Sequence, residues 1–185
     1  MEFVKNKEMY LIVQDTQFNR KYHNYKLGDV CDCSKKHNAK YVCYKKAKRK
    51  LFKTPREKKI VFMESLHEEV RKSINKNLPS RLSSIILYDN IDDCYLLAKK
   101  WKNNVGVLPL GLFKVNCVGI LHACATTPDE QKSNQLNKQA HIAGITRFWQ
   151  GDNSAKTKEY FFRGKAQIIQ VLNFDDGYYE KNNFV

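Results

Sequence analysis

A short β-type run between two helix patterns most constrains how this chain can fold. Residues 78–90 read LPSRLSSIILYDN, and the apolar character of residues 82–88 predicts a buried strand. A helix pattern ends before this run, because Pro79 disfavours helical geometry at the residue before it. Four polar residues lie where the loop leads into the strand: Ser80, Arg81, Ser83 and Ser84. An arginine and three hydroxyls in this position fit a phosphate or ribose site, and they also fit a well-capped loop.

The helix before this run has a clear start and a clear face. Thr54 can cap it, Pro55 suits its first turn, and Glu57 completes a capping box. The helix is expected to continue to about Asn75. Its apolar face recurs every three or four residues and comprises Ile60, Met63, Leu66, Val70 and Ile74.

Two further helices are predicted. The first follows a cap at Asp89 or Asn90 and stops at residues 103–104, with a buried face of Ile91, Cys94, Leu97, Ala98 and Trp101. The second covers about residues 134–149 and ends at Gly151. Its inner candidates are Leu136, Ala140, Ile145 and Trp149.

The other apolar runs predict strands. They cover residues 9–13, a short strand after a turn at residues 27–30, residues 105–108 and 112–121, and a hairpin of residues 159–163 and 166–172. This order predicts a mixed α+β fold, with a mixed or antiparallel sheet flanked by helices. The length favours one domain over residues 1–185.

Positive charge is concentrated in one segment. Residues 20–59, which follow the first strand as an insertion, hold 15 Lys or Arg against three acidic residues, a net +12 of the chain's +14. Such asymmetry favours a polyanionic partner, with nucleic acid first.

The basic segment also contains aromatic residues, among them Tyr41, Tyr44 and Phe52. Phosphates pair with the cations and unstacked bases stack on the rings. The candidate nucleic-acid-binding residues are Lys45, Lys46, Lys48, Arg49, Lys50 and Lys53. The alternative interpretation is a solvated charge run.

Cysteine and histidine patterns allow two other chemistries, neither of which is favoured. Zinc needs four N or S ligands; the set Cys31, Cys33, His37 and Cys43 can supply them, but its spacing matches no standard zinc knuckle. We therefore expect surface thiols and no metal site. Cys124 and His122 share a strand face, and we expect a buried thiol beside a hydrogen-bonded histidine rather than a nucleophile.

The sequence predicts a cytoplasmic protein. It contains no run of 18 apolar residues that would span a membrane, and its first residues, MEFVK, lack the apolar core of a signal peptide. We accordingly expect no membrane association and six reduced cysteines.

Residues 68–172 resemble the ADP-ribosyltransferase-like superfamily, particularly its bacterial and phage members. The likeness is carried by EEVRK at 68–72, PSRLSSIILY at 79–88, a helix ending in Trp101, RFWQG at 147–151 and EYFFRG at 159–164. It implies a split mixed sheet that holds NAD in a cleft.

The resemblance also implies residue roles. The glutamate that contacts the nicotinamide ribose corresponds to Glu159, and the hydroxyl-bearing strand corresponds to Ser83 and Ser84. The first strand of such enzymes commonly carries a basic or polar residue that positions NAD. Here Gln14 occupies that place, and the strand has no His or Arg.

Three more residues complete the expected NAD site. Arg81 would hold the diphosphate through a bidentate contact. Trp149 or Tyr88 would stack on a ring of the dinucleotide.

The resemblance and the basic segment together imply an NAD-dependent ADP-ribosyltransferase that modifies RNA or single-stranded DNA, as a toxin or a defence effector. A base within a duplex must first be unstacked. Two alternatives stay open: a non-catalytic nucleic-acid-binding accessory protein, and a transferase that modifies protein. An antitoxin or inhibitor protein is a further expected partner.

Overall fold

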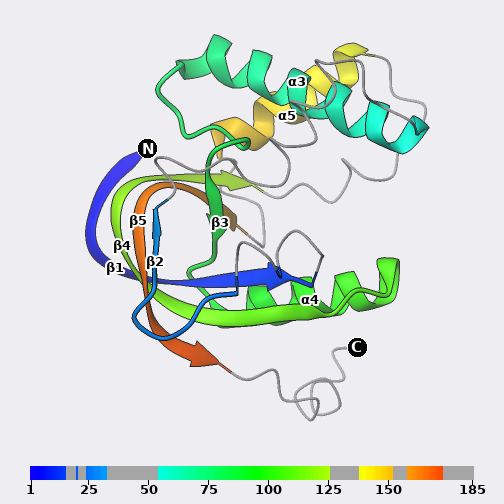
Figure 1. The fold of residues 1–185 in the computed structure, drawn as a ribbon. Helices are drawn as coiled ribbons and strands as arrows, with labels where there is room; N and C mark the ends of the chain where they lie inside the picture. The colour runs from blue at the N-terminus through cyan, green and yellow to red at the C-terminus, as the bar shows by residue number, and fades with distance from the viewer. Residues whose placement is uncertain (16–19, 21–23, 33–53, 126–137, 152–157, 173–185) are drawn as a thin grey trace. The chain divides into compact units, whose positions relative to one another are not determined.

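A computed structural model describes residues 1–15, 20, 24–32, 54–125, 138–151 and 158–172 (Figure 1). In these residues the helices are α3 (Pro55–Asn75), α4 (Ile91–Val105) and α5 (Lys138–Gln150). The strands are β1 (Glu2–Gln14), β2 (Val30–Asp32), β3 (Ile85–Leu87), β4 (Pro109–Ala125) and β5 (Lys158–Leu172). None of the described helices is long and apolar enough to cross a membrane.

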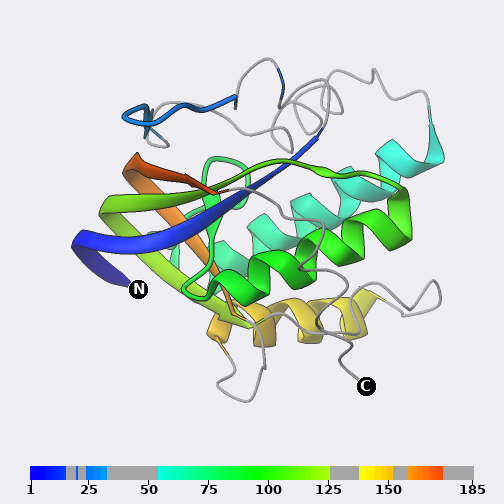
Figure 2. The ribbon, with the colours of Figure 1, turned by 90° about the horizontal axis from the view of Figure 1, so that it is seen from below.

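The strands form an open antiparallel sheet in the order β1-β4-β5-β2, and β3 pairs with β5. Figures 1 and 2 show β1, β4 and β5 running side by side. Helices and antiparallel strands thus share one chain, which confirms the predicted α+β class.

Contacts divide the chain into two compact units. The first comprises Met1–Val4, Asp32–Ile86 and Gly119–Gly164, and the second comprises Lys5–Cys31, Leu87–Val118 and Lys165–Val185. The basic segment predicted as an insertion includes β2 and the start of α3, while its residues 21–23 and 33–53 lie outside the described part of the chain.

The first unit is built around α3 and α5, which pack against each other (Figure 1). Its apolar core draws on both helices, on β4 and on β5 through Leu66, Val70, Leu78, Cys124, Ile145, Phe148, Trp149 and Phe161. Leu66, Val70, Ile145 and Trp149 were predicted to be internal and are buried. Ile74 was also predicted to be internal, but it is 37% exposed because it lies in the last turn of α3, so this prediction was wrong.

The predicted helix ends hold with one exception. Lys58 N–H donates to Thr54 O at the start of α3 (3.2 Å), and Asn90 caps α4 by accepting from Asp92 N–H (3.0 Å). Gly151, with φ of 71°, follows α5 as expected; the predicted start of this helix, residues 134–137, lies outside the described residues. Residues 103–104 do not stop α4, because Gly106, with φ of 64°, supplies the left-handed C-cap.

Three strand predictions were wrong. Residues 105–108 are not a strand, since Val105 still belongs to α4. The strand predicted over residues 112–121 was too short at its start, because β4 begins at Pro109, a position where the missing N–H of proline is tolerated. No hairpin forms at Gly164-Lys165, because β5 continues through both residues.

Gly164 serves a close approach of two strands rather than a turn. Its φ is 157° and that of Gly119 on β4 is 156°. A Cβ on Gly119 would lie 2.4 Å from Arg163 O and 2.8 Å from Gly164 Cα, both backbone atoms. The glycine at position 119 is therefore required by both conformation and space.

We expect Gly119→Ala to lower the free energy of unfolding by about 2 kcal/mol or more, because the new methyl group meets a backbone carbonyl at an unfavourable φ. Gly144→Ala, in α5, is the matched control: no described atom lies within 4 Å of its Cβ position, so helix propensity should raise stability by up to about 1 kcal/mol. Urea unfolding of both variants measures this. Equal effects of the two substitutions would contradict the proposed close approach of the strands.

Candidate functional site

The inward face of α3 carries charge in a region that is otherwise apolar. Glu64, His67 and Arg71 are all buried, although they lie among the core residues Leu66 and Val70. Spacings of three, four and seven residues place the three polar side chains on one side of the helix. Buried charges are costly unless they are paired, so their partners define this region.

Arg71 fastens the loop after α3 to the helix. Its Nε and Nη2 donate to the carboxylate of Glu68, at 2.9 Å for the shortest pair, and Nη1 donates to Lys76 O (2.9 Å) and Leu78 O (2.7 Å). Ser80 Oγ donates to Glu68 Oε1 at 2.6 Å and accepts from Leu82 N–H. These bonds all serve the local backbone, so we assign Arg71 and Glu68 a structural role.

Arg81 has a different environment. Its Nε and Nη2 donate to the two carboxylate oxygens of Glu64 at 3.3 and 3.4 Å, and the side chains of the pair are only 13% and 7% exposed. The guanidinium carbon lies 5.2 Å from the ring centre of Phe148 and 5.6 Å from that of Phe161. Cation–π contacts of this kind hold the guanidinium in place beside the carboxylate.

Trp149 and His122 support these rings. Trp149 is 1% exposed, stacks on His122 at 6.0 Å and contacts Phe148 and Phe161. His122 Nε2 lies 2.9 Å from Trp149 O; since a carbonyl only accepts, we assign the proton to Nε2. Burial lowers the pKa of His122, so the ring is neutral at pH 7.

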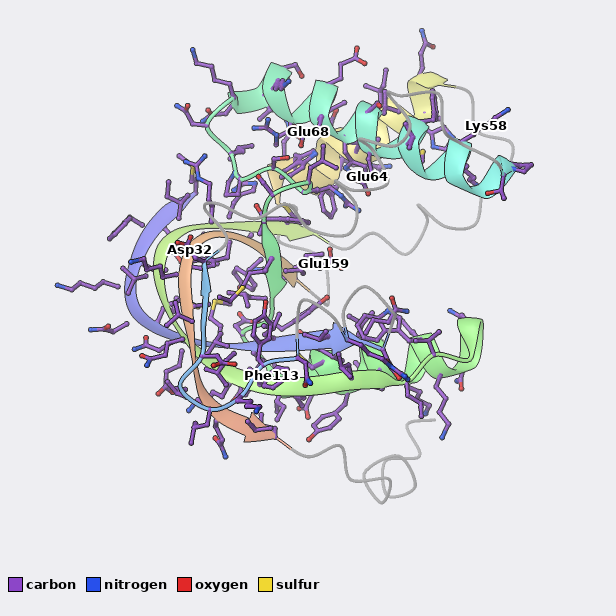
Figure 3. All side chains as sticks on the ribbon, viewed as in Figure 1. Asp32, Lys58, Glu64, Glu68, Phe113 and Glu159 are labelled. Atoms are coloured by element: carbon purple, nitrogen blue, oxygen red, sulfur yellow. The ribbon has the colours of Figure 1, made fainter. Side chains whose placement is uncertain are left out.

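Glu159 lies near the start of β5, two residues before Phe161 (Figure 3). Alternate residues of a strand share a face, so Glu159 projects from the face of β5 whose Phe161 supports Arg81. Besides its neighbours β4 and β2, β5 pairs with β3, which directly follows Ser83 and Ser84. Arg81, the two serines and Glu159 therefore belong to one compact unit, in or next to two strands that pair with each other.

The serines lie in a turn rather than in a strand. Both Ser83 N–H and Ser84 N–H donate to Ser80 O, at 3.1 and 2.9 Å, and β3 begins only at Ile85. The prediction of a strand from residue 82 was thus three residues too long at its start. Ser83 is partly buried and Ser84 is buried.

The other predicted ligand-binding residues belong to the second unit, to the core of the first unit or to residues outside the description. Gln14 and Tyr88 belong to the second unit; Tyr88 is buried, and its backbone pairs with that of Tyr10. Trp149 is a core residue, and stacking on a ligand ring would require one of its aromatic contacts to open. The candidate nucleic-acid-binding residues at positions 45–53 lie outside the described residues.

The structure describes only part of the candidate zinc set. Cys31 is buried and accepts from Tyr25 OH at 3.1 Å, while Cys33, His37 and Cys43 lie outside the description. Among the described residues, no cluster of His, Cys, Asp and Glu is arranged to hold a metal. Cys124 is buried in the core beside the hydrogen-bonded His122, which fits the structural interpretation of that pair.

The sequence contained an unused signal for this region. Glu64, His67 and Arg71 interrupt the apolar face of α3 at helical spacing. Charged residues on a face that must be buried require partners. Charged residues on a buried helix face would have predicted partners in the nearby loop after the helix. That loop supplies Arg81 for Glu64 and the carbonyl oxygens of Lys76 and Leu78 for Arg71.

We expect Glu64→Gln to lower the free energy of unfolding by about 3 kcal/mol, because it removes the carboxylate that accepts from Nε and Nη2 of the buried Arg81 cation. The matched control is Glu8→Gln, which breaks the more exposed pair with Lys114 and should cost less than about 1 kcal/mol. Chemical denaturation at pH 7 measures both. Similar costs for the two substitutions would show that the Arg81–Glu64 pair is not a buried ion pair.

His122 should make stability depend on pH. Its pKa is lowered from 6.5 in the folded chain, so the unfolded chain binds the proton more readily and the contribution is lost as pH falls below about 6.5. We expect the free energy of unfolding to fall between pH 7.5 and 5.5, and to fall less in His122→Gln. An unchanged pH dependence in the variant would show that His122 does not titrate in this way.

Comparison with known proteins gives a family but no activity. Among curated proteins, no sequence matches the chain. A family model described as "Protein of unknown function (DUF2441)" matches residues 1–174, which include every described element of the fold. The chain therefore belongs to the DUF2441 family.

Proposed function

We propose that this chain is an NAD-dependent ADP-ribosyltransferase with the fold of that superfamily, which modifies nucleic acid as a toxin or a defence effector. The observation that carries the proposal is the pairing of β3 with β5. It relates Glu159 on β5 to the serine turn before β3, on a strand face whose Phe161 contacts Arg81. These are the residues that the sequence resemblance implicates in binding NAD.

Glu159 suits the chemistry of glycosidic bond cleavage. As the bond between the ribose C1′ and the nicotinamide nitrogen breaks, nicotinamide leaves with the bonding electron pair and positive charge develops on the ribose. A carboxylate that accepts a hydrogen bond from the ribose 2′-hydroxyl stabilises that charge more in the transition state than in the ground state. The acceptor then bonds to C1′ and loses a proton.

Arg81 is better suited than Arg71 to bind the diphosphate. The bonds between Arg81 and Glu64 measure 3.3 and 3.4 Å, whereas Arg71 binds Glu68 at 2.9 Å and also holds two carbonyl oxygens. A phosphate oxygen that replaced the longer bonds to Glu64 would give Arg81 another charged acceptor. Gln14 and Tyr88 belong to the second unit, and the proposal does not depend on them.

The positive charge of the chain is the reason for proposing nucleic acid as the acceptor of ADP-ribose. A net +12 over residues 20–59 favours a polyanion over most proteins. The same charge favours the second candidate function, a nucleic-acid-binding accessory protein without catalytic activity. Nucleic-acid binding that persists without any transfer from NAD would support that second function.

The proposal is tested with NAD labelled in its adenylate half, incubated with RNA, single-stranded DNA or protein. We expect label on nucleic acid, and a roughly 10²- to 10³-fold slower transfer by Glu159→Gln, since the amide cannot stabilise the developing charge. Glu8→Gln removes an exposed carboxylate and should leave the rate unchanged. Label on protein alone would assign a protein acceptor. No label on any acceptor, or full activity of Glu159→Gln, would refute the proposed enzyme.

A further inference from the structure

The outward face of α3 combines lysines with an exposed aromatic ring. Helical spacing places Lys58, Phe62, Glu69 and Lys72 on one side of the helix, and all four are exposed. We call these four residues the α3 outer face. Two cations and one anion leave it basic, and Lys59 adds a further cation at its margin.

Phe62 is the unusual member of this face, with 49% of its surface exposed. A single exposed apolar residue is common in soluble proteins and by itself needs no explanation. Its neighbours make this one different: Lys58 and Lys59 precede it by four and three residues, which puts both ammonium groups within one turn of the ring. The pair also ends the segment that carries most of the chain's positive charge.

This combination matches the chemistry of a single polynucleotide strand. Lysines neutralise phosphates, and an exposed ring offers a flat surface on which an unpaired base can stack. A duplex keeps the faces of its bases stacked internally, so the ring would gain little from it. An acidic protein partner would use the lysines but would not require the ring.

We propose that the α3 outer face binds single-stranded nucleic acid, with one base stacked on Phe62 and the adjacent phosphates paired with Lys58 and Lys59. The inference rests on the proposed function only in taking nucleic acid as the partner. It concerns a separate surface: Phe62 and Glu64 are two residues apart on a helix, so they point to nearly opposite sides. Figure 3 shows Lys58 at the beginning of α3 and Glu64 and Glu68 farther along it.

The test measures the affinity of the full chain for fluorescein-labelled 12-nucleotide RNA and DNA of the same mixed sequence, single-stranded and as duplexes, by fluorescence anisotropy. We expect Phe62→Ala and Phe62→Leu to weaken single-strand binding roughly 5-fold or more, because both lose the ring. Phe62→Tyr keeps a stacking ring and should retain wild-type affinity. Leu96→Ala, which removes an exposed apolar side chain of α4, should have no effect.

The lysines are tested by the salt dependence of binding. Neutralising Lys58 and Lys59 together as glutamines should reduce the slope of log affinity against log salt by about 1.4, because each lysine that pairs with a phosphate of a single strand adds about 0.7 to that slope. The matched control neutralises Lys99 and Lys100 of α4, which are also exposed, and should leave the slope unchanged. The RNA and DNA arms identify which polymer the surface prefers.

Wild-type affinity in Phe62→Ala, or equal losses in the Ala, Leu and Tyr variants, would overturn the stacking site. Equal binding of duplex and single strand would overturn it as well. Absence of any binding by the wild-type chain would refute both this surface and a nucleic-acid acceptor, but not transfer to protein. If Phe62→Ala and Phe62→Leu weaken binding, Phe62→Tyr does not, and no label is transferred from NAD, the binding surface is supported and the proposed enzyme is refuted.

Discussion

Two ion pairs on the inward face of α3 hold the loop between α3 and β3 in place. Glu68 and Arg71 tie the loop backbone to the helix, and Glu64 receives Arg81 from the far end of the same loop. Each carboxylate is retained by a specific partner, since an unpaired charge in this environment would cost several kcal/mol. The conformation of the serine turn, and hence the entry into β3, depends on these contacts.

From this constraint follows the arrangement of residues on which the proposed function rests. The loop delivers Ser83 and Ser84 to the start of β3, and pairing of β3 with β5 relates them to Glu159. The guanidinium of Arg81 makes cation–π contacts with the rings of Phe148 and Phe161, and its N–H groups donate to the carboxylate of Glu64. A cation, hydroxyl groups and a carboxylate are thus supplied by segments that are far apart in the sequence but belong to one compact unit.

Patterns among neighbouring residues were sufficient to predict the helices and the α+β class. The start of α3 after Thr54, the cap at Asn90 and the stop at Gly151 depend on residues a few positions apart, so the sequence shows them. Long-range effects were not visible: Gly164 looks like a turn residue, and only its strand neighbour Gly119 shows that it serves a close approach. Arg81, the serines and Glu159 were named from the sequence, and their role in a site stays a prediction. The pairing of Arg81 with Glu64 was not visible in the sequence, because it depends on packing between a helix and the loop that follows it.

The proposed NAD site is tested most directly by a crystal structure of the chain with an NAD analogue whose glycosidic bond cannot be cleaved. We expect the ribose 2′-hydroxyl to lie within about 3.2 Å of the Glu159 carboxylate and Arg81 to contact the diphosphate. An analogue bound away from these residues, or a Glu159 carboxylate that points away from the nicotinamide ribose, would refute this site.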